Sequence, residues 1–494
     1  MDGAADDMRI SALIEPGLAL GAGDDATDVT SLTSDSRAAR PGSLFAALTG
    51  RRADGARYVA DAVARGAVAV LGPPGLDAPA GIAVLVADNP RQALARAAAR
   101  FHDAQPATVC AVTGTSGKTS VAEFTRQIWA ATGAQAASLG TLGVVAPGRR
   151  VAGSLTTPDP VALHGELARL ANDGVTHLAM EASSHGLDQF RLDGVALAAA
   201  AFTNLSRDHL DYHRDMAAYL AVKLRLFEDL LPRGGAAVAN ADDPNFGAIA
   251  GIAARRGHRL IGFGRTGRDL RLVGREVDAG GQILDLRIAG RARRVRLALA
   301  GGFQAMNALA ALGLVIGAGG DADAAAAALD RLTGVPGRLQ RAATRRNGAA
   351  VYVDYAHKPD ALRNLLETLR PHAAGRLAVV FGCGGERDTG KRPEMGAIAA
   401  RLADRVYVTD DNPRGEDPAT IRAAVAAACP GAIEIADRRT AIARAVRDLA
   451  PGDVLAIAGK GHETGQIVGA TVHPFDDVAQ AQAAVAAADD GAGP

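Results

Sequence analysis

The chain has 494 residues, of which 48% are hydrophobic and 22% are charged. This length is too great for one ordinary hydrophobic core, so we expect two to four domains. The 54 acidic residues balance the 54 basic ones, which excludes the strongly basic surface of proteins that bind nucleic acid or an anionic membrane.

The cysteines and the first residues indicate the compartment. Cys110, Cys383 and Cys429 lie far apart without Cys-x-x-Cys spacing, which excludes a disulfide framework or a cysteine zinc cluster and predicts a reducing cytoplasm. Residues 1–7 are acidic and lack the pattern of a signal peptide. The most apolar run, residues 308–320, is short and punctuated by glycine, so we expect no membrane span.

Lysine is rare in this chain. Of the 54 basic residues five are lysine, which leaves 49 arginines. An amine is compact and can lose its proton, whereas a guanidinium cannot. The lysines are therefore candidates for positions where arginine cannot serve; they are Lys118, Lys223, Lys358, Lys391 and Lys460.

Residues 1–105 alternate short apolar runs with alanine-rich helical segments, which predicts a small α/β domain. Two polar, turn-like segments interrupt this pattern, Asp35-Ser36-Arg37 and residues 50–55. Arg37, Arg51 and Arg52 are candidates for contact with an anionic ligand, although each arginine alone is better explained as part of a solvated loop.

The segment Thr113–Ser120 reads Thr-Gly-Thr-Ser-Gly-Lys-Thr-Ser and lies between a strand-like run and a helical segment. Such a turn lets backbone N–H groups surround phosphate oxygens, while the helix N-terminus and the lysine add positive charge. The loop is shorter than the general motif, because Val112 stands where that motif has its first glycine. We predict a nucleotide phosphate site, with the Thr119 or Ser120 hydroxyl placed for Mg²⁺; its residues are Gly114, Thr115, Ser116, Gly117, Lys118, Thr119 and Ser120.

From residue 106 to about 336, strand-like runs alternate with helical segments, which predicts a mostly parallel sheet with ligands at the C-terminal ends of its strands. Polar clusters follow three of the apolar runs. Within them, Glu181 offers a carboxylate to Mg²⁺ and His209 is a second candidate ligand. Lys223 lies in a largely apolar helical segment, where partial burial would lower the pKa of its amine.

Beyond a linker at residues 334–338 a second α/β alternation begins. Three polar loops follow strand-like runs there, at residues 381–388, 411–414 and 459–463. Together they offer Arg387 and Arg414 to a carboxylate and Glu463 to an ammonium, which predicts a pocket for an amino acid. Any one of these loops alone is also explained by ordinary turn chemistry. Strands are expected near Val351, Val379, Val406 and Leu455, and helices at Asp360–Leu369 and Ile421–Ala428.

Taken together, these residues resemble the Mur ligases, the ATP-dependent amide-forming enzymes of peptidoglycan synthesis. The short phosphate loop, the trio Glu181, His209 and Lys223, and Gly337-Arg338 are similar to motifs of that family. The likeness is strongest to the branch that adds the third amino acid of the peptide, and it runs from about Asp35 to Gln466. Further motifs of that branch are matched at residues 155–158, 181–191, 353–359 and 381–388.

The resemblance implies a three-domain α/β fold. A UDP-sugar domain would occupy residues 1–105, a central P-loop domain with a mostly parallel sheet residues 106–337, and a Rossmann-like amino-acid domain residues 338–494. ATP would also meet Asn307, Arg338 and Asp354. The UDP-muramoyl dipeptide would meet Ser34, Ser36, Arg51, Arg52, Ala53, Thr156, Thr157, Ser183, Gln189 and Arg191.

The resemblance also implies two Mg²⁺ ions. Glu181 and the Thr119 hydroxyl would bind the first ion. His209 would bind the second together with Lys223, carbamylated to N6-carboxylysine. Lys118, Glu181, His209 and Lys223 would then form the catalytic set.

In this family the sequence Asp411-Asn412-Pro413-Arg414 marks enzymes that take meso-diaminopimelate, whereas lysine-adding relatives differ at the arginine. Diaminopimelate has an extra carboxylate, to which Arg414 can donate two hydrogen bonds. Arg387 would lie nearby. Gly459 and Glu463 would complete the pocket. The chain departs from the family pattern at Glu386, where aspartate is frequent, and at Gln304, where asparagine is frequent.

We therefore expect an ATP-dependent ligase that adds meso-diaminopimelate to the γ-carboxylate of UDP-MurNAc-L-Ala-D-Glu through an acyl phosphate, as a cytoplasmic monomer. A lysine-adding ligase would share the fold and mechanism, but Arg414 argues against it. A folylpolyglutamate-type ligase would share the short loop and the lysine carbamate, but would not need a UDP-sugar domain. A non-ligating nucleotide-dependent binding protein would not need Glu181, His209 and Lys223 intact.

Overall fold

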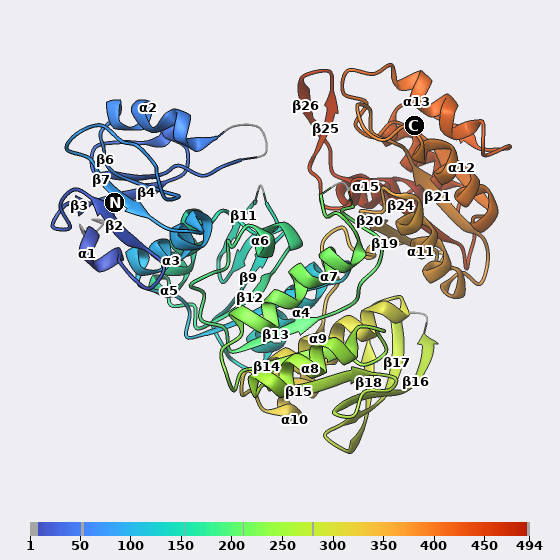
Figure 1. Ribbon diagram of the computed structural model, residues 1–494. Coiled ribbons are helices and arrows are strands. Elements are labelled where there is room, and N and C mark those ends of the chain that lie inside the picture. The colour runs from blue at the N-terminus through green and yellow to red at the C-terminus, as the bar shows by residue number, and fades with distance from the viewer. Residues whose placement is uncertain (1–7, 51–53, 154, 211, 279–280, 492–494) are drawn as a thin grey trace. The chain divides into compact units, whose positions relative to one another are not determined.

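The computed structural model describes residues 8–50, 54–153, 155–210, 212–278 and 281–491 (Figure 1). The chain divides into two compact units: one runs up to Arg271 and includes Leu309–Ala326, and the other comprises Leu272–Ala308 and the chain from Ala327 onward. Both units mix helices with mainly parallel sheets, so the predicted α/β class is confirmed. The domain boundaries expected after residues 105 and 337 stay predictions.

The first unit begins with a five-stranded sheet in the order β2-β7-β6-β5-β4, in which only the edge strand β2 is antiparallel. The helix that follows this sheet in the chain begins at Pro90, because the Asn89 side chain caps it by accepting from the Gln92 N–H and proline suits a first turn. The elements are β1 (Met8–Arg9), α1 (Ile10–Leu13), β2 (Ala19–Ala22), β3 (Asp28–Val29), β4 (Ser31–Thr33), η1 (Ser36–Ala38), β5 (Ser43–Ala46), η2 (Gly55–Tyr58), α2 (Val59–Ala64), β6 (Ala67–Gly72), β7 (Ala83–Val86) and α3 (Pro90–His102).

The larger sheet of the first unit has the order β11-β10-β9-β12-β8-β13-β14-β15-β16. It is parallel from β9 to β16, with β10 and β11 as an antiparallel edge. Glu181 pairs with Val112 and Phe202 with Thr113, so three central strands end at the same edge, where such sheets bind ligands. The strands are β8 (Thr108–Thr113), β9 (Ala136–Gly140), β10 (Gly143–Ala146), β11 (Arg149–Val151), β12 (His177–Glu181), β13 (Ala199–Phe202), β14 (Ala236–Asn240), β15 (Arg259–Gly264) and β16 (Leu270–Asp278).

Helices cover both faces of this sheet (Figure 1). On one face, α5, α8 and the π-helical turn η3 pack on alternate strand residues such as Val109 and Ala111. Cys110, which points to the other face, meets Leu314 of α9 there. The helices of this unit are α4 (Lys118–Ala131), α5 (Pro160–Asn172), α6 (Ser184–Asp188), α7 (Met216–Arg225), η3 (Leu226–Leu230) and α8 (Phe246–Arg256). It also includes the part of α9 (Gly302–Gly317) from Leu309 onward and nearly all of α10 (Ala322–Ala327), whereas η4 (Ala328–Arg331) belongs to the second unit.

The second unit has a six-stranded sheet in the order β19-β20-β24-β21-β22-β23, antiparallel only at β19. One hydrophobic core lies under α11, α12 and α13 and another under α14 and α15, so both faces are covered. The elements are β17 (Gly281–Ile288), β18 (Arg291–Leu297), β19 (Gln340–Thr344), β20 (Ala350–Asp354), α11 (Pro359–Leu369), η5 (Arg370–His372), β21 (Leu377–Phe381), α12 (Lys391–Leu402), β22 (Arg405–Val408), α13 (Pro418–Ala426), β23 (Ile433–Glu434), α14 (Arg438–Arg447), β24 (Val454–Ala458), β25 (Gly465–Val468), β26 (Thr471–Pro474) and α15 (Asp477–Asp489).

The predicted elements of this unit match the observed ones closely. The four strands expected near Val351, Val379, Val406 and Leu455 are β20, β21, β22 and β24. The helix expected from Ile421 begins three residues earlier, at Pro418, because Asp417 caps the N–H groups of Ala419 and Thr420.

Arg438 and Asp477 form a fully buried ion pair at the first residues of α14 and α15, with an N–O distance of 2.7 Å. Because Asp477→Ala would leave the guanidinium buried without its counter-charge, we expect the free energy of unfolding to fall by about 3–5 kcal/mol. Glu276→Ala, which opens the exposed Arg294–Glu276 pair, should cost at most about 1 kcal/mol. Urea denaturation of both variants tests this, and similar losses in the two would contradict it.

Candidate active site

β8 ends at Thr113 and α4 begins at Lys118, so residues 114–117 form the turn that the sequence predicts. Gly114 has a φ of 145°, and a Cβ at this position would lie 1.9 Å from Thr203 Oγ1. Only glycine therefore fits there. No side chain caps the N-terminus of α4, which leaves the first N–H groups of this helix to point at a phosphate. Thr119 and Ser120 lie buried in its first turn.

The end of β13 holds this loop in place. The Asn204 carbonyl accepts from Thr115 N at 2.9 Å, and its Oδ1 accepts from Ser116 N at 3.0 Å. Thr203 Oγ1 donates to the Ser116 carbonyl at 2.7 Å. Sequence reasoning missed Asn204 as a site residue; its place in the polar cluster after an apolar run was the signal for it.

Two lysines converge on the carbonyl oxygen of Gly114. Lys118 Nζ donates to it at 2.9 Å and Lys223 Nζ at 2.8 Å. Lys223 is only 1% exposed, and its Nζ lies 4.3 Å from the centre of the Tyr219 ring. Burial, and after it the positive charge of Lys118, lowers the pKa of Lys223 to about 6. Its amine is therefore largely uncharged at neutral pH, which is the form that can add CO₂.

Glu181 ends β12 at the same sheet edge and is 1% exposed. Its carboxylate accepts from the Thr141 N–H at 2.7 Å and from the Thr141 hydroxyl at 3.2 Å. The hydroxyls of Thr141 and Thr156 lie 3.1 Å apart. A Cβ at Gly140 would lie 2.1 Å from Glu181 Oε1, so the strand before Thr141 must carry glycine for the carboxylate to fit. The sequence contained no signal for Thr141.

His209 lies in the loop after β13 and has a left-handed backbone, with a φ of 54°. Its ring lies 5.0 Å from the ring of His185 and 6.2 Å from that of Tyr219. Tyr219 therefore contacts both His209 and Lys223. Among the described residues, no group of three His, Cys, Asp or Glu side chains is arranged to hold a metal ion. The Glu181 carboxylate and the Thr119 hydroxyl, both buried near the phosphate loop, are hard oxygen donors of the kind that Mg²⁺ prefers.

The residues expected to hold the muramoyl dipeptide form one hydrogen-bonded group beside Glu181. Thr157 Oγ1 donates to the Glu181 carbonyl at 2.9 Å and accepts from the Ser183 N–H at 3.1 Å. Arg191 donates to the Thr157 carbonyl at 2.6 Å and to Gln189 Oε1 at 2.7 Å. With Thr156, which meets Thr141, all five predicted residues of the first unit's larger sheet are brought together.

The residues expected at the uridine end lie apart from this group. Ser34 is exposed and Ser36 half-buried after β4 of the small sheet. Asp35 pairs with Arg37 there at 2.8 Å, and that hydrogen bond lowers the pKa of Asp35 to about 2. Arg51, Arg52 and Ala53 lie outside the described residues.

Three residues expected near ATP belong to the second unit. Asn307 lies on α9, and its side chain donates to Gln304 Oε1 at 3.0 Å, so the unusual Gln304 orients Asn307. Asp354 ends β20 and accepts from the Leu339 N–H at 2.6 Å; its burial raises the pKa of its carboxyl. The Arg338 guanidinium lies 5.0 Å from the centre of the Tyr355 ring.

The three polar loops of the second unit follow β21, β22 and β24, which are neighbours in its sheet. Arg414 donates to the Gly385 carbonyl at 2.9 Å, and Asn412 donates to Glu463 Oε2 at 3.0 Å. Asp411 is buried beside Gly459. These contacts bring Asp411, Asn412, Pro413, Arg414, Gly459 and Glu463 together, whereas Arg387 is exposed in the loop after β21.

Three family models match consecutive parts of the chain. The Mur ligase middle domain matches residues 112–315, the glutamate ligase domain of Mur ligases residues 337–461, and the catalytic domain of the Mur ligase family residues 28–102. The chain belongs to the Mur ligase family. Membership makes it an ATP-dependent ligase that forms an amide bond, as the resemblance implied.

Individual relatives agree with this assignment. The UDP-N-acetylmuramoyl-L-alanyl-D-glutamate–2,6-diaminopimelate ligase of Bradyrhizobium diazoefficiens is 56% identical over 96% of this chain and 97% of its own length. A solved structure of a ligase with the same description is 33% identical, with a TM-score of 0.75 over 97% of this chain and 99% of that one. The folylpolyglutamate synthase of Mycobacterium tuberculosis shares the fold, with a TM-score of 0.59 and 22% identity over 72% of this chain and 89% of that one.

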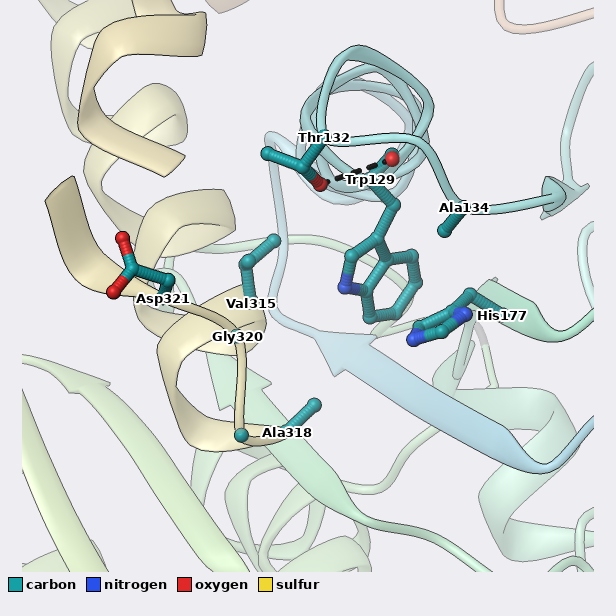
Figure 2. Close-up of a pocket in the computed structure, with 9 residues that line it drawn as sticks. Trp129, Thr132, Ala134, His177, Val315, Ala318, Gly320 and Asp321 are labelled. Atoms are coloured by element: carbon teal, nitrogen blue, oxygen red, sulfur yellow. Dashed lines mark hydrogen bonds between the residues drawn. The ribbon is translucent and has the colours of Figure 1, made fainter. Parts of the chain in front are cut away.

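A cavity of about 290 Å³ lies away from this site, in the first unit (Figure 2). Trp129 near the end of α4, His177 at the start of β12 and Asp321 after α9 line it. Because α4 starts at the phosphate loop and ends here, the cavity belongs to the opposite edge of the sheet.

In the part of the chain that the structure describes, no helix is long and apolar enough to span a membrane.

The buried amine of Lys223 makes stability depend on pH in a defined way. Unfolded lysine, with a pKa near 10.5, binds a proton at pH 7, whereas the folded chain with a pKa of about 6 does not. The lowered pKa therefore destabilises the fold at pH 7, and this penalty fades as the pH rises toward 10.5. Lys223→Met removes it, so the variant should have the higher Tm at pH 7 and lose that advantage by pH 10.

Thermal unfolding in CO₂-free buffer measures this difference, because carbamylation of the wild-type amine is then avoided. Val273→Ala, which changes an exposed side chain without an ionisable group, is the control and should show the same Tm difference from the wild type at both pH values. A Tm difference for Lys223→Met that is the same at both pH values would contradict a buried neutral amine.

Proposed function

We propose that this chain adds meso-diaminopimelate to the D-glutamyl γ-carboxylate of UDP-MurNAc-L-Ala-D-Glu, with ATP as co-substrate. The observation that carries the proposal is the pair of opposite charges, Arg414 and Glu463, which both contact Asn412. The Asn412 side chain donates to Glu463 Oε2 at 3.0 Å, and the Asn412 carbonyl accepts from Arg414 at 3.4 Å. A guanidinium suits a carboxylate and a carboxylate suits an ammonium, so such a pocket fits an amino acid with charged groups at both ends. The substrate named for the relatives supports the same choice.

The first step is phosphoryl transfer. A γ-carboxylate oxygen of the substrate attacks the γ-phosphorus of ATP in line, the bond to the β–γ bridging oxygen breaks, and ADP leaves with an acyl phosphate formed. The N–H groups at the start of α4 and the Lys118 ammonium stabilise the charge that spreads over the phosphoryl oxygens. Thr156, Thr157, Ser183, Gln189 and Arg191 would hold the dipeptide beside Glu181.

The second step forms the amide. The neutral amine of diaminopimelate attacks the acyl carbon, a tetrahedral intermediate forms, and phosphate leaves with the amine proton passing to solvent or a nearby base. Arg414, with Arg387, binds the far carboxylate, and Glu463 binds an ammonium. Asp411, Asn412, Pro413 and Gly459 shape the loops that carry them.

Two Mg²⁺ ions belong to this proposal, and they would neutralise phosphate charge when bound. Glu181 and Thr119 would hold the first, and His209 with carbamylated Lys223 the second. The buried, largely neutral amine of Lys223 supports the carbamate, because only a neutral amine adds CO₂. Asn307, Arg338 and Asp354 would bind the nucleoside and phosphates of ATP, and Ser34, Ser36 and Arg51 to Ala53 the uridine nucleotide.

The wider setting is proposed on the same basis. The domains would be residues 1–105 for the UDP-sugar, 106–337 for ATP and 338–494 for the amino acid. We place the reaction in cytoplasmic peptidoglycan precursor synthesis and take the active form to be a monomer. The three buried free cysteines are compatible with a reducing compartment.

The main alternative is a lysine-adding ligase of the same family, and the charges of the amino-acid pocket distinguish the two. L-lysine lacks the second carboxylate, so it would leave the Arg414 guanidinium without its partner. ADP release by the purified protein, with UDP-muramoyl dipeptide, ATP and Mg²⁺, should depend on meso-diaminopimelate and not on L-lysine. Release with lysine instead would keep the ligase and overturn the amino acid; release with neither would favour a folate-type or non-ligating protein.

Arg414→Lys keeps the positive charge but loses the bidentate hydrogen bonds that a guanidinium can donate to a carboxylate. We expect kcat/KM for diaminopimelate to fall about 10- to 100-fold, because a charge-assisted hydrogen bond contributes about 1.5–3 kcal/mol. Arg294→Lys, at an exposed surface pair, is the matched control and should leave kcat/KM unchanged. Equal effects of the two substitutions would contradict the role of Arg414.

A further inference from the structure

Lys460 is a lysine that the proposed reaction does not use. It is 0% exposed, in the loop after β24. Its Nζ lies 2.9 Å from Asn412 Oδ1, 3.3 Å from Glu463 Oε2 and 3.6 Å from Asp411 Oδ1. All three neighbours belong to the loops of the amino-acid pocket.

Lys460 determines which way the Asn412 amide faces. Asn412 Oδ1 accepts from Lys460 Nζ and from the Ile467 N–H, both at 2.9 Å. Two donors on one oxygen fix the amide, because its NH₂ group could not face either of them. The NH₂ group must then point the other way, where it donates to Glu463 Oε2 at 3.0 Å.

The same amine fixes the carboxylate of Glu463. Oε2 receives both Lys460 and Asn412, whereas no hydrogen bond to Oε1 exists among the residues that the structure describes. The Glu463 side chain is 35% exposed. One oxygen is thus held by two donors, which leaves the other available as an acceptor for a cation.

The charges around Lys460 are arranged for a cationic ligand. Arg438 and Asp477 neutralise each other in their buried pair, which leaves Lys460 with two carboxylates, Asp411 and Glu463. This set carries one net negative charge, which an incoming ammonium would balance. Without Lys460 two carboxylates would face each other, and Glu463 would lose the contact that holds it.

We propose that Lys460 is a positioning residue: it locks Asn412 and Glu463 so that Glu463 Oε1 receives an ammonium of the amino-acid substrate. Arginine cannot replace it, because a planar guanidinium with five donors does not fit where one compact amine meets three oxygens. This explains why lysine stands at position 460 in a chain whose basic residues are mostly arginine. The inference rests on the proposed function of this pocket.

Steady-state kinetics of Lys460→Met test the inference. We expect KM for diaminopimelate to rise about 30-fold or more, because opening a buried charged pair typically costs 2 kcal/mol or more, while KM for ATP stays within about twofold. Lys460→Arg should not restore the low KM. Equal changes in both KM values, an unchanged KM for diaminopimelate, or rescue by arginine would each overturn it.

A double-mutant cycle separates positioning from general destabilisation. If Lys460 acts through Glu463, Lys460→Met should raise KM for diaminopimelate much less in a Glu463→Gln background than in the wild type. Arg345→Met, which breaks the largely buried pair with Asp489, is the control and should lower Tm without changing this KM. Full additivity of the two pocket substitutions would overturn the inference.

Lys460→Gln keeps one N–H for Asn412 without the charge, and it gives the same kinetic test should Lys460→Met not fold. Its KM for diaminopimelate should also rise, and a wild-type value would overturn the inference. The wild-type assay is run first. If wild-type protein releases no ADP with diaminopimelate, the proposed function fails; if it does and the Lys460 variants match it, only the role of Lys460 fails.

Discussion

The candidate site of the first unit depends on one crowded point, the carbonyl oxygen of Gly114. Two lysines donate to it, and the adjoining loop is held by hydrogen bonds from the end of β13. The strands beneath consist largely of small residues, such as 199–201 in β13 and 236–239 in β14. Lys223 itself is 1% exposed, with its amine against the Gly114 carbonyl and the Tyr219 ring. This burial, and after it the charge of Lys118, lowers the pKa of its amine. An uncharged lysine beside a phosphate loop is therefore a consequence of the fold.

The candidate site of the second unit consists of charged side chains, whereas that of the first unit contains the buried neutral amine of Lys223. Lys460 lies 3.3 Å from Glu463 and 3.6 Å from Asp411, and Arg414 donates to the Gly385 carbonyl. These contacts link the loops that carry the charged side chains. This arrangement strains the backbone. Arg414 and Glu386 have left-handed φ values of 52° and 55°, and His209 of the first unit has one of 54°. Such residues cost on the order of 1–3 kcal/mol each and persist where surrounding contacts hold them.

Local patterns in the sequence predicted most of this arrangement. The phosphate loop was predicted from a glycine-rich turn between an apolar run and a helical segment. Glu181 and the three loops of the second unit were predicted from the polar clusters that follow strand-like runs. Parallel strands carry their C-terminal residues to one edge, so position along the chain predicts position in space. Residues that act by supporting others were not predictable in this way. Thr141 is one of them, because it reaches Glu181 only through the pairing of β9 with β12. Asn204 could be found as a member of the polar cluster after β13, but its role in holding the phosphate loop, through its backbone as much as its side chain, is visible only in the structure.

We propose that Lys223 becomes an oxygen donor when its buried neutral amine is carbamylated. It is tested most directly by ADP release from Lys223→Ala, measured with and without a short-chain carboxylic acid that can occupy the space of the missing carbamate. We expect no activity for the variant alone, partial recovery with the acid, and none with the neutral amide of the same size. Full activity of the unrescued variant would contradict it.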